Sequence, residues 1–145
     1  MTDAGKIELH IPSVPGAEKA AMERAASLAK EMGFPDDRIE DLKTAVAEAC
    51  INAMEHGNRL DASTKVGVTL TVADRKLQVD VRDQGKGVAE AEQPDIDRKM
   101  EGKEKTRGWG IFLIRSLMDE VQFGSAPEGG GVVRMVIHLD RERAG

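Results

Sequence analysis

Three short segments carry side chains whose types and spacing suit metal and phosphate chemistry. The first holds Glu48 and Asn52, which lie four residues apart in a stretch of helical periodicity, so both fall on one helix face. An asparagine carbonyl oxygen is a ligand for a hard cation, and a nearby carboxylate can accept a proton. By itself the pair is more typical of a solvated helix face, so it assigns no function alone.

The second segment is the turn Asp83-Gln84-Gly85-Lys86-Gly87, which closes a strand-like stretch. Glycines two residues apart let the backbone approach a flat ligand. A carboxylate at the strand end can accept the exocyclic amine of adenine, and guanine has no donor there, so the arrangement can select the base. An ordinary turn, in which Asp and Gly serve only backbone conformation, explains the same residues.

The third segment, Arg107-Gly108-Trp109-Gly110-Ile111, precedes an apolar run that predicts a helix over 111–118. Glycines before a helix expose its first amides, where the helix dipole favours an anion. Lys103 and Lys105 lie just upstream and, with Arg107, can reach a terminal phosphate. The alternative is a charged loop with a glycine-rich helix start. Neither a P-loop nor a dinucleotide-binding fingerprint is present.

Hydrophobic periodicity predicts the elements that must position these segments. The order of strands and helices predicts an α+β two-layer sandwich, with a mixed, mainly antiparallel sheet and helices on one face, in one domain spanning 1–145. The polar interval before the last helix is long enough to predict a lid over about 86–107. The predicted strands are 6–12, 65–72, 76–83, 121–123 and 132–139, and the predicted helices are 17–32, 36–56 and 111–118.

Composition narrows the class of protein. The net charge of -5 and the pI near 5.3 argue against a nonspecific nucleic-acid binder, which needs a basic face. No apolar run approaches the roughly 20 residues of a membrane span, and the first residues lack a signal-peptide core. The single cysteine, Cys50, excludes an internal disulfide. We therefore expect a cytoplasmic protein without membrane or direct nucleic-acid contacts.

The three segments together, in this order, resemble the motifs of the GHKL ATPase superfamily. Residues 48–57 resemble its N box, 83–87 its first glycine box and 107–111 its second glycine box. Within that superfamily, residues 41–53 and 110–121 are very similar to bacterial anti-sigma factor serine/threonine-protein kinases. The resemblance spans nearly the whole chain.

The resemblance implies ATP and Mg²⁺ as cofactors and assigns roles to individual residues. Glu48 is implied as the general base on a serine or threonine hydroxyl, and Asn52 as the magnesium ligand. Asp83 is implied to bind adenine, and Gly108 and Gly110 to hold phosphate as the lid closes. The implied nucleotide-binding residues are Asn52, Asp83, Gly85, Gly87, Lys105, Arg107, Gly108, Trp109, Gly110 and Ile111.

The resemblance also implies a biological activity. Such kinases phosphorylate an anti-sigma-factor antagonist, sequester a sigma factor and are commonly homodimers. The alternative is a nucleotide-dependent regulatory module that binds a sigma factor or a stress-switch partner and has little or no kinase activity. The chain departs from the family at two positions: Val132 follows Gly131 where the family has a threonine that assists adenine binding, and Trp109 replaces a smaller aliphatic residue.

Overall fold

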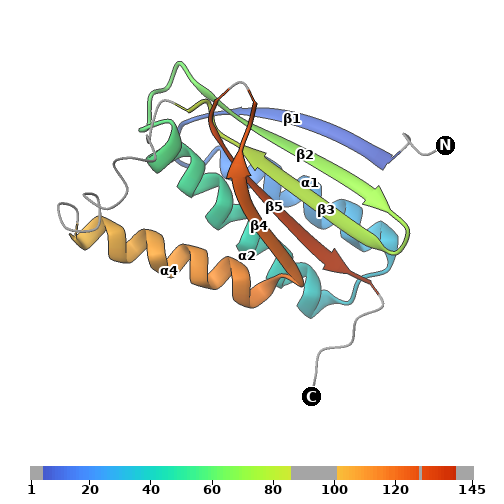
Figure 1. Cartoon of the computed structure of the whole chain (residues 1–145). Helices are drawn as coiled ribbons and strands as arrows, with labels where there is room; N and C mark the ends of the chain where they lie inside the picture. The colour runs from blue at the N-terminus through green and yellow to red at the C-terminus, as the bar shows by residue number, and fades with distance from the viewer. Residues whose placement is uncertain (1–4, 86–100, 128, 140–145) are drawn as a thin grey trace.

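The structure is a computed structural model that describes residues 5–85, 101–127 and 129–139, with only the backbone for 101–107. Its elements form a sheet and a layer of helices (Figure 1). In chain order they are β1 (Lys6–Pro12), α1 (Glu18–Met32), α2 (Asp36–Asn52), η2 (Ala53–Gly57), β2 (Lys65–Ala73), β3 (Lys76–Arg82), α4 (Glu101–Leu117), β4 (Glu120–Ser125) and β5 (Gly131–His138).

The strands form one sheet in the order β1-β2-β3-β5-β4. Each neighbouring pair is antiparallel in the part of the chain that the structure describes, so the sheet is antiparallel rather than mixed. The predicted two-layer α+β architecture is confirmed. The five strands differ from their predicted ranges by at most two residues at either end.

The helices lie along one face of the sheet with α2 between α1 and α4 (Figure 1). The stripe Ala21, Ala25 and Ala29 of α1 is fully buried, which lets the backbones of α1 and α2 approach closely. Leu42 and Val46 of α2 are likewise fully buried within the core. The helix that carries Glu48 and Asn52 is therefore fixed on both sides.

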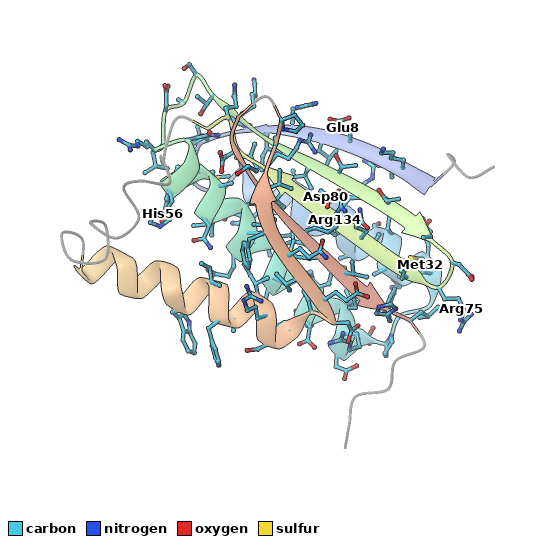
Figure 2. The ribbon with its side chains drawn as sticks, in the orientation of Figure 1. Glu8, Met32, His56, Arg75, Asp80 and Arg134 are labelled. Carbon is cyan, nitrogen blue, oxygen red and sulfur yellow. The ribbon has the colours of Figure 1, made fainter. Side chains whose placement is uncertain are left out.

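The helix predicted over 36–56 changes its geometry after Asn52. The last turn, η2, is a π-helix over Ala53–Gly57. Single π turns are rare and occur frequently at functional sites, because the extra residue in the turn redirects the side chains that follow it. His56 lies on this turn, at the end of α2 (Figure 2).

Helix α4 begins at Glu101, ten residues before the predicted start at Ile111. Gly108 and Gly110 consequently lie inside a helix, and the prediction that they precede its first amides is wrong for this structure. Lys, Glu and Arg are good helix formers, and an isolated glycine costs only about 1 kcal/mol. Of the predicted lid, residues 86–100 lie outside the described residues, and residues 101–107 are helical.

A buried arginine joins the start of α2 to the end of α4. Arg38 is only 6% exposed and forms ion pairs with Asp41 (2.8 Å) and Asp119 (3.1 Å). Its guanidinium also donates a hydrogen bond of 3.1 Å to the Leu117 carbonyl oxygen, one of the carbonyls that a helix end leaves without a partner. Asp119 also accepts a hydrogen bond from the His138 amide, so the same carboxylate ties α4 to β5.

The other face of the sheet is polar and is held by cross-strand ion pairs. Arg134 of β5 donates to Asp80 of β3 over 2.9 Å, and Figure 2 shows these two side chains together on neighbouring strands. Arg82 donates to Glu8 over 2.9 Å on the same face. Among the described residues, no helix is long and apolar enough to cross a bilayer.

Candidate functional site

Asp83 lies directly after β3, with its carboxylate on the helix side of the sheet. Its Oδ1 atom accepts hydrogen bonds from the backbone amides of Gly85 (2.8 Å) and Gly131 (2.9 Å). Among the described residues, Oδ2 has no hydrogen-bond partner. One carboxylate oxygen therefore fixes the side chain, and the other is available to a ligand.

Glycines surround this carboxylate because no side chain fits beside it. A β-carbon at Gly57 would lie 2.1 Å from Asp83 Oδ2, and one at Gly130 would lie 2.3 Å from the Asp83 carbonyl oxygen. Gly85 and Gly130 also have positive φ angles of 69° and 97°, which other residues rarely adopt. The first glycine segment and the turn before β5 are thus built around Asp83.

Asn58, which the sequence analysis did not single out, positions the segment that follows Asp83. It is fully buried, and its amide nitrogen donates to Ser13 and to the Lys65 carbonyl oxygen, both at 3.0 Å. Its carbonyl oxygen accepts a hydrogen bond of 2.7 Å from the Gln84 amide. No local pattern signals this role, because its partners lie 45, 7 and 26 residues away in the sequence.

A pocket of about 270 Å³ opens between α2 and the ends of β3, β4 and β5. Four predicted site residues line it together: Asn52, Asp83, Gly85 and Ile111. Its other lining residues are Ala49, Ala53, His56, Gly57, Val81, Phe123, Gly124, Ser125, Gly130, Gly131, Val132 and Val133. The mixture of apolar walls and a few polar groups is typical of a small-molecule site.

Glu48 and Asn52 meet α4 at Gly110. A β-carbon there would lie 2.8 Å from Glu48 Oε1, and 3.3 Å from Asn52 Nδ2. Gly110 is buried, and its lack of a side chain allows α4 to lie directly against these two residues. Glu48 does not line the pocket but stands one helical turn from Asn52, which does.

The Glu48 carboxyl has a raised affinity for protons. Burial raises the pKa of Glu48 above its ordinary value, and repulsion from the nearby Glu55 raises it further. A carboxylate with a raised pKa is a stronger base, which suits proton abstraction near neutral pH.

The remaining predicted nucleotide-binding residues lie in different places. Trp109 is 59% exposed and stacks on Phe112 with ring centroids 5.4 Å apart, away from the pocket. The reason is the continuous helix, since each residue turns by about 100°, so Gly110 faces α2 whereas Trp109 faces solvent. Gly108 is exposed as well. Gly87 and the side chains of Lys105 and Arg107 lie outside the described residues.

The side chains of Val132 and Val133 point to opposite faces of the sheet. Val132 shares the polar face with Arg134, because side chains alternate along β5. Val133 is therefore the residue whose side chain faces the helices, next to Gly131 and Asp83. The wall at this point is aliphatic, without a hydroxyl group on either valine.

Comparison with known sequences identifies the family of this chain. The profile of the family described as "Histidine kinase-like ATPase domain" matches residues 11–137. The chain belongs to the histidine kinase-like ATPase domain family. The match contains the Glu48–Asn52 helix face, Asp83 and Gly110, so the predicted GHKL resemblance is confirmed at the level of the family.

Curated relatives of this histidine kinase-like ATPase are similar over nearly their whole length. A protein of Bacillus licheniformis named "Serine-protein kinase RsbW" is 34% identical, covering 97% of this chain and 89% of the relative. The "Anti-sigma F factor" of Bacillus subtilis (strain 168) is 31% identical, covering 96% of this chain and 97% of the relative. The predicted resemblance to anti-sigma factor serine kinases is confirmed by these similarities.

Solved structures share the histidine kinase-like fold at lower identity. The crystal structure of the RsbU and RsbW domains of a Mycobacterium tuberculosis protein superposes with a TM-score of 0.67 at 19% identity, covering 94% of this chain and 33% of that one. The SiaB-SiaC complex of Pseudomonas aeruginosa gives a TM-score of 0.65 at 12% identity, covering 90% and 88%. These likenesses support the fold.

The donor set of this histidine kinase-like site fits a magnesium nucleotide better than a metal bound by protein alone. In the part of the chain that is described, no three His, Cys, Asp or Glu side chains gather into a metal site. Asn52 lines the pocket, and its amide has no hydrogen-bond partner among the described residues. Mg²⁺ typically takes one or two protein ligands and completes its shell with phosphate oxygens and water.

Proposed function

We propose that this chain is an ATP-dependent serine/threonine-protein kinase that acts as an anti-sigma factor. It phosphorylates an anti-sigma-factor antagonist and sequesters a sigma factor. The observation that carries this proposal is the position of Glu48. Its carboxyl has a raised pKa and lies one helical turn from Asn52, which lines the pocket. The names of the curated relatives, a serine-protein kinase and an anti-sigma factor, support the same activity.

Asp83, Asn52 and Glu48 each have one task in the proposed reaction. Asp83 Oδ2 accepts the exocyclic amine of adenine, and Asn52 contributes its carbonyl oxygen to Mg²⁺. The metal ion, when bound, neutralises charge on the phosphate oxygens. Glu48 accepts the proton of the serine or threonine hydroxyl as its oxygen bonds to the γ-phosphorus, and ADP leaves with the electrons of the broken P–O bond. Positioning and charge neutralisation supply most of the catalysis in phosphoryl transfer, and the general base adds to them.

Phosphorylation changes the affinity of the antagonist through charge. A phosphate adds about -1.5 to -2 charges at neutral pH, which weakens an interface by repulsion and desolvation. Release of the modified antagonist leaves the kinase free to hold the sigma factor. We propose that the chain works as a homodimer.

Incubation with radiolabelled ATP, Mg²⁺ and a purified anti-sigma-factor antagonist tests the activity. We expect label on a serine or threonine of the antagonist and none when Mg²⁺ is chelated. Absence of labelled protein, combined with measurable ATP binding, would reject the kinase and leave the nucleotide-dependent binding module.

Replacement of Asp83 by Asn is expected to weaken ATP binding by roughly 10- to 100-fold, the effect of losing a hydrogen bond to a charged group. The Gly85 and Gly131 amides hold an oxygen at the Oδ1 position, so Asp83→Asn puts the new NH₂ group at the free position. That donor opposes the amine of adenine but matches the O6 acceptor of guanine. Competition between ATP and GTP measures the change, and an unchanged ratio of affinities would contradict the role of Asp83.

A further inference from the structure

Phe123 lines the pocket but lies outside the three motif segments 48–57, 83–87 and 107–111. It lies on the edge strand β4 and pairs with Val133 of β5, and both residues line the pocket with Ile111 of α4. The chain has three Phe, one Trp and no Tyr, so an aromatic residue at this wall is distinctive. Phe34, by contrast, is only 5% exposed and belongs to the core.

The Phe123 ring lies outside the hydrophobic core. It is 41% exposed on an edge strand, so it contributes less to the core than a buried phenylalanine does. The Arg115 guanidinium lies 4.9 Å from the centre of the ring, a cation–π contact between α4 and β4. One side of the ring is therefore occupied by Arg115, and the ring also borders the pocket.

The register of the sheet relates Phe123 to Asp83. Asp83 stands opposite Gly131, and Phe123 opposite Val133, so the two residues flank β5 on its helix side. They are separated by two strand spacings, roughly 10 Å, and by two residues along the strand, roughly 7 Å. A purine held at Asp83, together with the length of the Phe123 side chain, spans this separation.

We propose that Phe123 is a base-contacting residue that packs against the purine whose amine Asp83 accepts, and that Arg115 positions its ring. This inference rests on the nucleotide site of the proposed function. Helix α4 carries Arg115 and also packs Gly110 against Glu48, the proposed general base. The Arg115–Phe123 contact therefore links the adenine end of the pocket to the helix beside Glu48.

Calorimetric titration of the purified full chain with adenosine, ADP and ATP tests the role of Phe123. Contact of a nucleobase with an aromatic ring raises affinity by about 5- to 150-fold. We expect Phe123→Ala to weaken the binding of adenosine by about 10-fold. The loss should be equal for the three ligands, because they share the base. Phe123→Tyr should restore the affinity to within about threefold, and competition by inorganic tripolyphosphate should not change.

Phe112→Ala is the matched control. This residue has the same type and a similar exposure (57%), but it stacks on Trp109 outside the pocket, so its affinities should equal those of the wild type. Unchanged affinity for adenosine in Phe123→Ala, or a loss confined to ATP, would overturn the inference while leaving the proposed function intact. Failure of the wild-type chain to bind ATP would instead reject the nucleotide site, and this inference with it.

A double-mutant cycle separates the two members of the contact. Arg115→Ala should weaken adenosine binding less than Phe123→Ala, with partial recovery in Arg115→Lys, and should add nothing in the Phe123→Ala background. Such coupling is expected only if Arg115 acts through the ring. Additive losses would reject its positioning role.

Discussion

Replacing Glu48 by Gln is expected to reduce phosphoryl transfer by about 10²- to 10⁴-fold, the usual contribution of a general base, with ATP affinity close to that of the wild type. Glutamine has the size of glutamate, so the contact with Gly110 is kept while the proton acceptor is lost. The pocket wall is unaffected because Glu48 does not line it. Single-turnover labelling of the antagonist and equilibrium ATP binding measure the two quantities separately.

Glu40→Gln is the matched control for this experiment. Glu40 lies on the same helix, its side chain is 70% exposed, and it pairs with Lys43 rather than with the pocket. Transfer and binding should both remain at wild-type levels. Equal losses of ATP binding and transfer in Glu48→Gln would show that this carboxylate holds nucleotide and would contradict its role as a base.

The pH dependence of transfer gives a second test of Glu48. The base must be deprotonated, so transfer is present above the pKa of Glu48 and is lost as the pH falls through it. Because burial and Glu55 raise that pKa, the acid limb lies at a higher pH than for an ordinary glutamate. Glu55→Gln removes the repulsion and should move the acid limb to lower pH, with unchanged activity on its plateau.

The strands and the position of Asp83 follow from the sequence because their signals are local. Alternation of Val66, Val68 and Leu70 shows which face is buried, and these three side chains are fully buried in the structure. The turn after β3 predicts a carboxylate beside glycines, and the structure places two backbone amides on one oxygen of Asp83. Here local preference and tertiary structure agree.

The start of α4 and the roles of Asn58 and Phe123 could not be predicted from the sequence, because they depend on contacts between segments distant in sequence. Two glycines and many charges made the segment before Ile111 resemble a loop, but packing of Gly110 against α2 favours a continuous helix. Asn58 follows a glycine and resembles a turn residue, yet its partners come from three distant segments. Phe123 gives no signal until β4 is placed beside β5 and Arg115.

Replacing Asn52 by Ala is expected to lower Mg²⁺-dependent ATP affinity by at least about 10- to 100-fold, since even the loss of an outer-shell partner of a metal ligand costs that much. The amide of Asn52 makes no hydrogen bond within the described residues, so its removal leaves no partner unsatisfied. Titrations with ATP in Mg²⁺ and in EDTA measure the metal-dependent part directly. In EDTA, Asn52→Ala should bind ATP nearly as the wild type does.

Two variants distinguish loss of the metal ligand from damage to the pocket. Asn52→Asp keeps an oxygen at the same position, so the gain in ATP affinity on adding Mg²⁺ should persist. Asn58→Ala breaks the hydrogen bonds that position the segment after Asp83 and should weaken adenosine binding equally with and without Mg²⁺. If Asn52→Ala behaved like Asn58→Ala, Asn52 would serve the shape of the pocket rather than the metal. Asn52 and Glu48 lie one turn apart on a helix that packs against α1 and α4. Loss of the Mg²⁺ response in Asn52→Ala, together with loss of transfer alone in Glu48→Gln, would therefore locate the γ-phosphate between these two side chains.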